Sequence, residues 1–273
     1  MRKINSSSNK AVVKKKEAQK ELNKRFKKMY KPVKNFVETV DQDALHQFRV
    51  QVKKLKAMLI LCSAESKNRN LLKDFKPVKK VFKKAGEIRN AHINLKLAEK
   101  YQLDDAAFKK QQQKALDESI EKFRSKAKKN LKSLKKAHFV LQNNLHRLHN
   151  KTIHSFYQEK LVAIDAFFSS PEFNDELHNT RKNIKLLLYN QKTAAKAIQN
   201  KIAFNADYLD NLQNAIGEWH DHNLAIETLA GTGKDESEAI NDLKNSNADL
   251  ENNILQESSS FMEKVSSAKT TSA

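Results

Sequence analysis

The sequence contains little of what tight turns and disulfide cross-links require. Its 273 residues include four glycines, three prolines and one cysteine, and aromatic residues make up only 7%. Scarce glycine and proline disfavour folds built from many short strands and turns. The single cysteine, Cys62, cannot form an intrachain disulfide and lies in an apolar run, so we expect a buried structural thiol in a reducing, cytoplasmic setting.

Long apolar segments are also missing. No stretch approaches the roughly 20 apolar residues that a membrane-spanning helix needs. The N-terminus is polar and basic, and it has no apolar stretch of signal-peptide length. We therefore expect no membrane insertion.

Charged residues are abundant. They make up 31% of the chain, and 52 basic against 32 acidic residues leave a net charge of +20. Many charged residues with few glycines and prolines favour an all-α fold of long helices. The positive surplus indicates a polyanionic partner such as nucleic acid, polyphosphate or an anionic membrane surface. Lysine outnumbers arginine 44 to 8, which suits diffuse attraction to a charged polymer better than bidentate reading of base edges.

One segment occurs twice, 132 residues apart. Residues 45–56 read LHQFRVQVKKLK and residues 177–188 read LHNTRKNIKLLL. The aligned cations are a histidine, an arginine and a lysine in each copy: His46, Arg49 and Lys53, then His178, Arg181 and Lys185. About forty residues later each copy has a second match, AGEIRNAHI around Gly86 and IGEWHDHNL around Gly217.

The spacing of these cations places them on one face of a helix, next to an apolar face. Cations that border a packed core have restricted rotamers and can hold phosphate or carboxylate oxygens. A solvated charged face is the alternative interpretation of either copy alone. Two copies with matching glycines favour two similar halves that each present cations to one acidic ligand.

Composition and periodicity predict three regions. Residues 1–10 form a frayed basic N-terminus, residues 11–230 a helical domain with halves of about 11–120 and 121–230, and residues 231–273 an acidic polar tail that is partly disordered. The tail has eight acidic and four basic residues and a weak helix near 249–261; solubilisation is favoured over a role as an internal competitor for the basic face. The segment from Lys122 to Lys136 has eight cations and no acid and is the strongest electrostatic patch.

Helices are predicted between the breaking residues of the domain. Pro32 is expected to break or restart the first helix, Gly86 is expected to permit close packing or a bend before the next helix, and Gly217 lies between two expected helices. The expected helices cover about 11–30, 41–64, 70–84, 86–100, 104–150, 152–168, 171–200, 207–216 and 218–229.

These motifs resemble the CHAD family, the conserved histidine α-helical domains. The first motif of that family is a histidine, an arginine three residues on and a basic cluster, which His46, Arg49, Lys53, Lys54 and Lys56 match. The second motif is recognisable in AGEIRN at 85–90, and the second half follows with the 177–188 segment and IGEWHD at 216–221. The resemblance covers about residues 15–230.

The resemblance implies two four-helix bundles related by a pseudo-two-fold, with basic residues lining a central groove or pore. It further implies binding of inorganic polyphosphate and, for some members, a location at polyphosphate granules. The implied polyphosphate-binding residues are His46, Arg49, Lys53, Lys54, Lys56, Arg89, His178, Arg181 and Lys185. Asn90 replaces an acidic residue of the family, so an orienting ion pair is expected to be missing in the first half. Leu186 and Leu188 replace frequent cations, so the second half is expected to bind more weakly.

Two other functions remain open at this point. General polyanion or nucleic-acid binding is the alternative, although there is no obvious stacking platform and no base-reading motif. An enzyme is not expected, because a P-loop, a glycine-rich phosphate cradle and a paired acidic metal motif are missing, and no cofactor or metal is predicted. Histidines of ordinary pKa beside phosphate predict tighter binding at pH 6 than at pH 8.

Overall fold

The computed structural model describes residues 12–68, 70–103, 105–198, 204–231 and 238–267. The predicted all-α fold is confirmed, since helices and short connections account for nearly all of these residues. The exception is a two-residue antiparallel ladder in which β1 (Val12–Val13) pairs with β2 (Leu148–His149).

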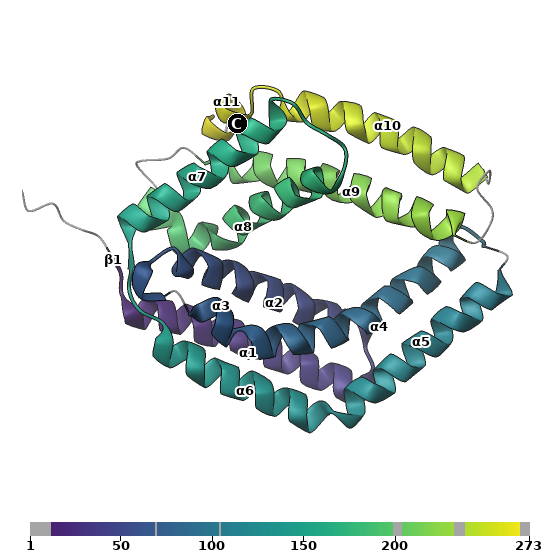
Figure 1. Ribbon diagram of the computed structural model, residues 1–273, viewed down its shortest axis with the longest axis horizontal. Helices are drawn as coiled ribbons and strands as arrows, with labels where there is room; N and C mark the ends of the chain where they lie inside the picture. The colour runs from purple at the N-terminus through teal and green to yellow at the C-terminus, as the bar shows by residue number, and fades with distance from the viewer. Residues whose placement is uncertain (1–11, 69, 104, 199–203, 232–237, 268–273) are drawn as a thin grey trace, which may run out of the picture.

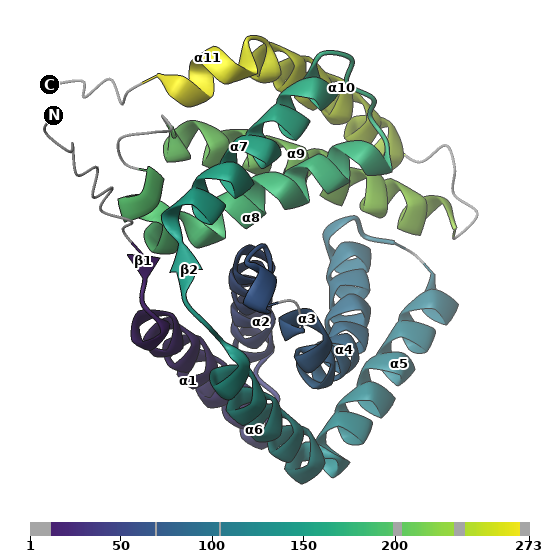
Figure 2. The same cartoon turned by 60° about the vertical axis from the view of Figure 1, so that its left-hand side comes forward.

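The helices form two layers (Figure 1). In chain order the first layer contains α1 (Lys15–Thr39), α2 (Gln42–Ser63), a 3-10 turn (Ser66–Asn68), α3 (Leu71–Asp74), α4 (Lys76–Lys100), α5 (Ala106–Ser125) and α6 (Ala127–Asn144). The second layer contains α7 (Asn150–Phe168), α8 (Asp175–Ile198), α9 (Ala206–Ala230), α10 (Glu238–Ser258) and α11 (Phe261–Ser266). The β1–β2 ladder marks the edge where the chain passes from the first layer to the second (Figure 2).

The boundary between the halves differs from the expected one near residue 120. Helix α6 packs against α1, α3 and α4, so it belongs to the first layer, and the change of layer follows it. The strongly basic α6 thus joins the other basic helices. By sequence, residues 1–147 contain 40 basic and 14 acidic residues, whereas residues 148–273 contain 12 and 18.

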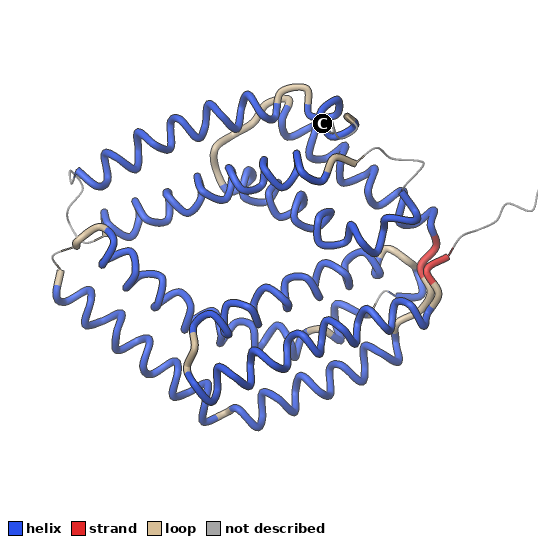
Figure 3. Tube along the Cα trace, turned by 180° about the vertical axis from the view of Figure 1, so that it is seen from behind, coloured by secondary structure: helices blue, strands red, loops and turns tan. Residues whose placement is uncertain are grey.

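The two layers meet through α2 and α8 and again through α4 and α9, as the tube in Figure 3 shows from behind. Apolar side chains of both layers form one continuous buried cluster, and a smaller cluster joins the end of α4 to α9 and α10. Burial on one stripe of each helix supplies most of the stabilisation of such an arrangement. Cys62 is buried in the larger cluster, which raises the pKa of its thiol to about 12.

Several predicted helix ends are corrected. Helix α1 continues through Pro32, which is buried, and α4 and α9 continue through Gly86 and Gly217 without interruption. The expected single helix over 104–150 is divided at Lys126 into α5 and α6. Tertiary packing overrides local breaking residues where the surrounding helices bury the segment.

The acidic segment after residue 231 also differs from the expectation of a polar tail with one weak helix. Within the described residues, α10 and α11 pack against α9 and α7. Ile254, Phe261 and Val265 are almost completely buried in the main core. The indole of Trp219 on α9 donates a hydrogen bond to Glu251 on α10 at 2.9 Å. The few apolar residues of this segment recur at helical spacing and pack onto the second layer, although the average composition of the segment is polar.

No helix among the described residues is both long and apolar enough to cross a membrane.

Candidate functional site

Helix α2 carries the first cation stripe, which we define as His46, Arg49, Lys53, Lys54 and Lys56. Asp41 begins the helix, and its carboxylate accepts a hydrogen bond from the Asp43 amide at 2.8 Å. The apolar face is fully enclosed by the core, as Leu45, Phe48 and Leu55 show no exposure. The cations therefore border the core on a rigid element, as predicted.

Arg49 is held against α4. Its Nη1 donates a hydrogen bond to the Phe82 carbonyl at 3.1 Å, and its Cζ lies 4.3 Å from the centre of the Phe82 ring. The guanidinium crosses α4 at Gly86, where an added Cβ would lie 2.8 Å from Nη1. Gly86 is thus required for the close approach of the arginine.

Arg181 is held against α9 in the corresponding way. Its Nε donates to the Gln213 carbonyl at 2.8 Å, and Lys185 Nζ donates to the Gln213 side-chain oxygen at 2.9 Å. A Cβ at Gly217 would collide with Nη2 of Arg181 and lie 2.8 Å from its Cζ and Nε. We call His178, Arg181 and Lys185 on α8 the second cation stripe.

Each arginine therefore binds the carbonyl four residues before a glycine, Phe82 before Gly86 and Gln213 before Gly217. The sequence matched these glycines, and the contact explains why glycine stands there. The equivalence is local to the arginine and its acceptor helix, and a pseudo-two-fold relation of the complete halves stays a prediction.

The two stripes come together where α2 and α8 pack. Lys53 is exposed at the surface, although neighbouring atoms partly desolvate its amine. This desolvation lowers the pKa of Lys53, Arg49 and Arg181 lower it further, and Asp221 opposes the shift. Lys54 Nζ lies 5.6 Å and Lys185 Nζ 5.7 Å from the centre of the Tyr189 ring. An aromatic ring thus lies within cation–π range of a lysine of each stripe.

Desolvation and nearby cations also shift the pKa of Lys185. Its pKa is lowered first by desolvation and then by Arg181 and Lys53, with Asp210 opposing. Cations from α2 and α8 repel one another. An anionic ligand would offset this repulsion and so stabilise the charged forms in both stripes at once.

Arg89 on α4 joins the first stripe. The pKa of His46 is lowered by desolvation and then by Arg89 and Lys53, and the pKa of Arg49 is lowered by desolvation and by Arg89. His92, one turn after Arg89, has a pKa lowered in the same manner. Arg89 was predicted as a binding residue and lies close enough to influence His46 and Arg49, whereas His92 was not among the predicted residues.

His178 stacks on His220, with ring centres 3.9 Å apart. Desolvation, then His220 and Lys182, lower the pKa of His178 to about 4. The pKa of His220 is also lowered, chiefly by desolvation. Desolvation thus disfavours the charged form of both imidazoles, and the low pKa of His178 moves the pH gain predicted from an ordinary histidine pKa to lower pH unless a bound anion raises that pKa.

Within the described residues, none of the nine predicted residues forms an ion pair with a carboxylate. The ion pairs found there involve Arg25, Lys114 and His149. No cluster of three or more metal-binding side chains occurs in the part of the chain that the structure describes. Partly buried cations without a paired carboxylate, as Arg49, Arg181 and Lys185 are, cost free energy that an anionic ligand would recover.

The sequence-predicted residues are not equally connected. Lys56 is exposed, and its amine makes no hydrogen bond to another described residue, so it extends the stripe by position alone. Phe82 and Gln213 position the two arginines and were not among the predicted binding residues, and Tyr189 contributes a ring near Lys54 and Lys185. Their spacing from the two glycines and from Lys185 is the sequence signal that could have identified them.

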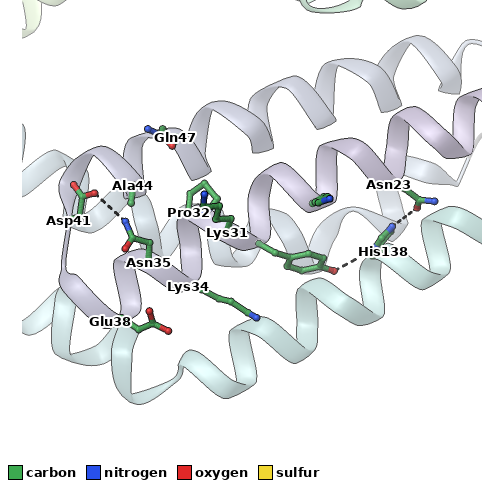
Figure 4. Close-up of a pocket in the computed structure, with 12 residues that line it drawn as sticks. Asn23, Lys31, Pro32, Lys34, Asn35, Glu38, Asp41, Ala44, Gln47 and His138 are labelled. Carbon is green, nitrogen blue, oxygen red and sulfur yellow. Dashed lines mark hydrogen bonds between the residues drawn. The ribbon is translucent and has the colours of Figure 1, made fainter.

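A hollow of about 800 Å³ lies elsewhere, between α1, the start of α2 and α6 (Figure 4). In it His138 contacts the Asn23 side-chain oxygen at 2.6 Å and the Tyr30 hydroxyl at 3.4 Å. Its lining mixes lysines with Glu38 and Asp41 and includes none of the nine cations. The mixed charge distinguishes it from the stripes.

Comparison with known proteins agrees with the motifs. A family model described as CHAD domain matches residues 20–230. The crystal structure of the CHAD domain from the plant Ricinus communis is similar, with a TM-score of 0.61 and 16% sequence identity over 91% of this chain and 93% of that chain. At that identity the likeness shows the fold. No curated protein matches the chain.

Proposed function

The chain belongs to the CHAD domain family, and from that premise we propose that it binds inorganic polyphosphate through the two cation stripes and Arg89. The observation that carries this proposal is the convergence of unpaired cations from α2, α4 and α8. The proposal includes a location at polyphosphate granules and a binding rather than a catalytic role.

The chemistry of the ligand fits these cations. Polyphosphate is a flexible chain of equal negative charges without bases, so its recognition needs spaced cations and few directional contacts. The two arginines are fixed by carbonyl acceptors and leave their other N–H groups for phosphate oxygens, and a guanidinium can hold a phosphate in bidentate fashion. The lysines add charge with less demand on geometry.

Carboxylates act on both stripes. Desolvation lowers the pKa values of Lys53 and Arg181, and Asp221 opposes both shifts; Asp43 and Asp210 do the same for His46 and Lys185. The expectation that the second half binds an anion more weakly therefore depends on Leu186 and Leu188, which stand at two positions of the repeat where the first half has Lys54 and Lys56.

The test is a salt series of binding to long-chain polyphosphate, with single-stranded RNA of matched charge as competitor. The variant is Arg49→Gln with Lys53→Gln and Arg181→Gln, and the control neutralises the exposed lysines Lys109, Lys110 and Lys114 on α5. Each lost phosphate contact should reduce the salt slope by about 0.7, so the stripe variant should lose about 2 and the control less.

Circular dichroism and thermal unfolding would verify that both variants fold. Equal losses in the stripe variant and the control would contradict the proposal. Equal binding of RNA and polyphosphate, vanishing together as salt rises, would instead favour general polyanion or nucleic-acid binding.

A further inference from the structure

A second group of unpaired cations lies on the opposite side of α4 from the stripes. Lys84 precedes Gly86 by two residues, which places it about 200° around the helix from the glycine that receives Arg49. Its Nζ donates a hydrogen bond at 3.0 Å to the side-chain oxygen of Asn130 on α6. Asn130 is only 3% exposed, so this bond fixes the ammonium of Lys84 at the α4–α6 contact.

Three further lysines lie near this ammonium, because Asn130, which holds it, follows Lys126 by four residues and Lys129 by one on α6, and Lys122 lies in the last turn of α5. Desolvation lowers the pKa of Lys84, and Lys126, Lys129 and Lys122 lower it further, while Glu87 alone opposes them. We call Lys84, Lys122, Lys126 and Lys129 the outer lysine cluster. None of its members forms an ion pair in the described part of the chain.

The break between α5 and α6 creates this cluster. Helix α5 ends at Ser125 and α6 begins at Ala127, so the two helices meet at one corner of the first layer (Figure 2), and Lys122 and Lys129 lie within one turn of that junction on either side. Lys122 lies in the last turn of α5, where the helix dipole stabilises a cation, so this lysine has an ordinary structural role as well. Lys126 and Lys129 lie at the start of α6, where no acidic residue is present and the dipole disfavours cations.

We propose that the outer lysine cluster is a second binding site for a segment of the same polyphosphate chain, so that long chains attach at both the stripes and the cluster. This inference rests on the proposed function. Attachment at the stripes raises the effective concentration of the remaining polymer at the cluster, which a short chain cannot exploit. The cluster therefore provides selectivity for long chains.

The experiment compares long-chain polyphosphate with tripolyphosphate, whose first binding event reports the stripes. The cluster variant is Lys84→Gln with Lys126→Gln and Lys129→Gln, and the charge-matched control is again the neutralisation of Lys109, Lys110 and Lys114. For long chains the salt slope of the cluster variant should fall by about 2, from three contacts at about 0.7 each, and that of the control should fall less. Tripolyphosphate binding should stay at the wild-type level.

Two results would overturn the inference. The cluster variant and the control could lose the same long-chain affinity, or the cluster variant could lose tripolyphosphate binding in proportion to long-chain binding. The stripe variant separates these failures from that of the proposed function, because unchanged tripolyphosphate binding in that variant would refute the stripes themselves. Thermal unfolding of each variant would show that it folds.

Discussion

Replacing the two helical glycines by alanine would test whether the arginines must lie across the neighbouring helices. An alanine Cβ at Gly86 would lie 2.8 Å from Nη1, the tip of the Arg49 side chain, which can swing away. At Gly217 the Cβ would also lie 2.8 Å from Cζ and Nε of Arg181, so the whole guanidinium must leave. The two variants therefore differ in how far the cation is displaced.

The effect on stability follows from two opposing contributions. Alanine in a helix interior is favoured over glycine by about 1 kcal/mol. A hydrogen bond from a charged group contributes about 1.5–3 kcal/mol, and Gly217→Ala breaks the 2.8 Å bond from Arg181 to the Gln213 carbonyl. We expect Gly217→Ala to lower the free energy of unfolding by about 1 kcal/mol. We expect Gly86→Ala to leave it nearly unchanged, because the more mobile tip of Arg49 can find water.

Polyphosphate affinity should fall in both variants. Displacing one fixed guanidinium removes about one charge-assisted contact of roughly 1.5 kcal/mol, which corresponds to about tenfold in Kd. Titration calorimetry would measure the affinity, and urea unfolding followed by Trp219 fluorescence would measure the stability. Gly231→Ala is the control, because its Cβ would have no contact closer than 3.4 Å. Wild-type affinity in both variants, as in the control, would refute the requirement for fixed arginines.

Three further predictions concern pH, charge and the acidic segment. Folding lowers the pKa of His178 to about 4, so as pH falls the unfolded chain binds a proton at this histidine before the folded chain does. The neutral His178 side chain therefore contributes its full share of the free energy of unfolding above about pH 6.5, and this contribution is lost as pH falls toward 4. His178→Gln should therefore flatten the dependence of Tm on pH in this window, and a dependence as steep as in the wild type would exclude His178 as its source. Asp221→Asn should tighten polyphosphate binding at low salt, because the Asp221 carboxylate offsets positive charge around Lys53 and Arg181. Titration with polyphosphate would measure the affinity, and Asp117→Asn at an exposed site on α5 is the control that should leave it nearly unchanged. Ile254→Ala should cost about 2–4 kcal/mol in urea unfolding, since this side chain is fully buried, and a loss below about 0.5 kcal/mol would show that α10 is peripheral.

Helix bounds were predicted most closely where the sequence has a capping residue and a regular apolar spacing. Helix α2 was located almost to the residue, because Asp41 caps it and its apolar face recurs with helical spacing. Helices α4 and α9 were divided near their glycines, although close packing was one of two alternatives at Gly86, because a sequence does not show which helix passes close to the glycine. The acidic segment was undervalued because its average composition is polar, although Ile254 and Phe261 provide enough apolar surface to dock it.

The sequence by itself determined that the fold is helical, that the net charge is strongly positive and that His46, Arg49 and Lys53 have counterparts in His178, Arg181 and Lys185. These properties depend on composition, periodicity and repetition, which are local or additive along the chain. Only the tertiary structure decided how the cations are held and which of them influence one another. The carbonyl acceptors of the arginines, the Tyr189 ring between two lysines and the Lys84–Asn130 contact join residues on different helices. Such contacts are set by how the helices pack, because the spacing along one helix shows which residues share a face but not which helix lies opposite that face.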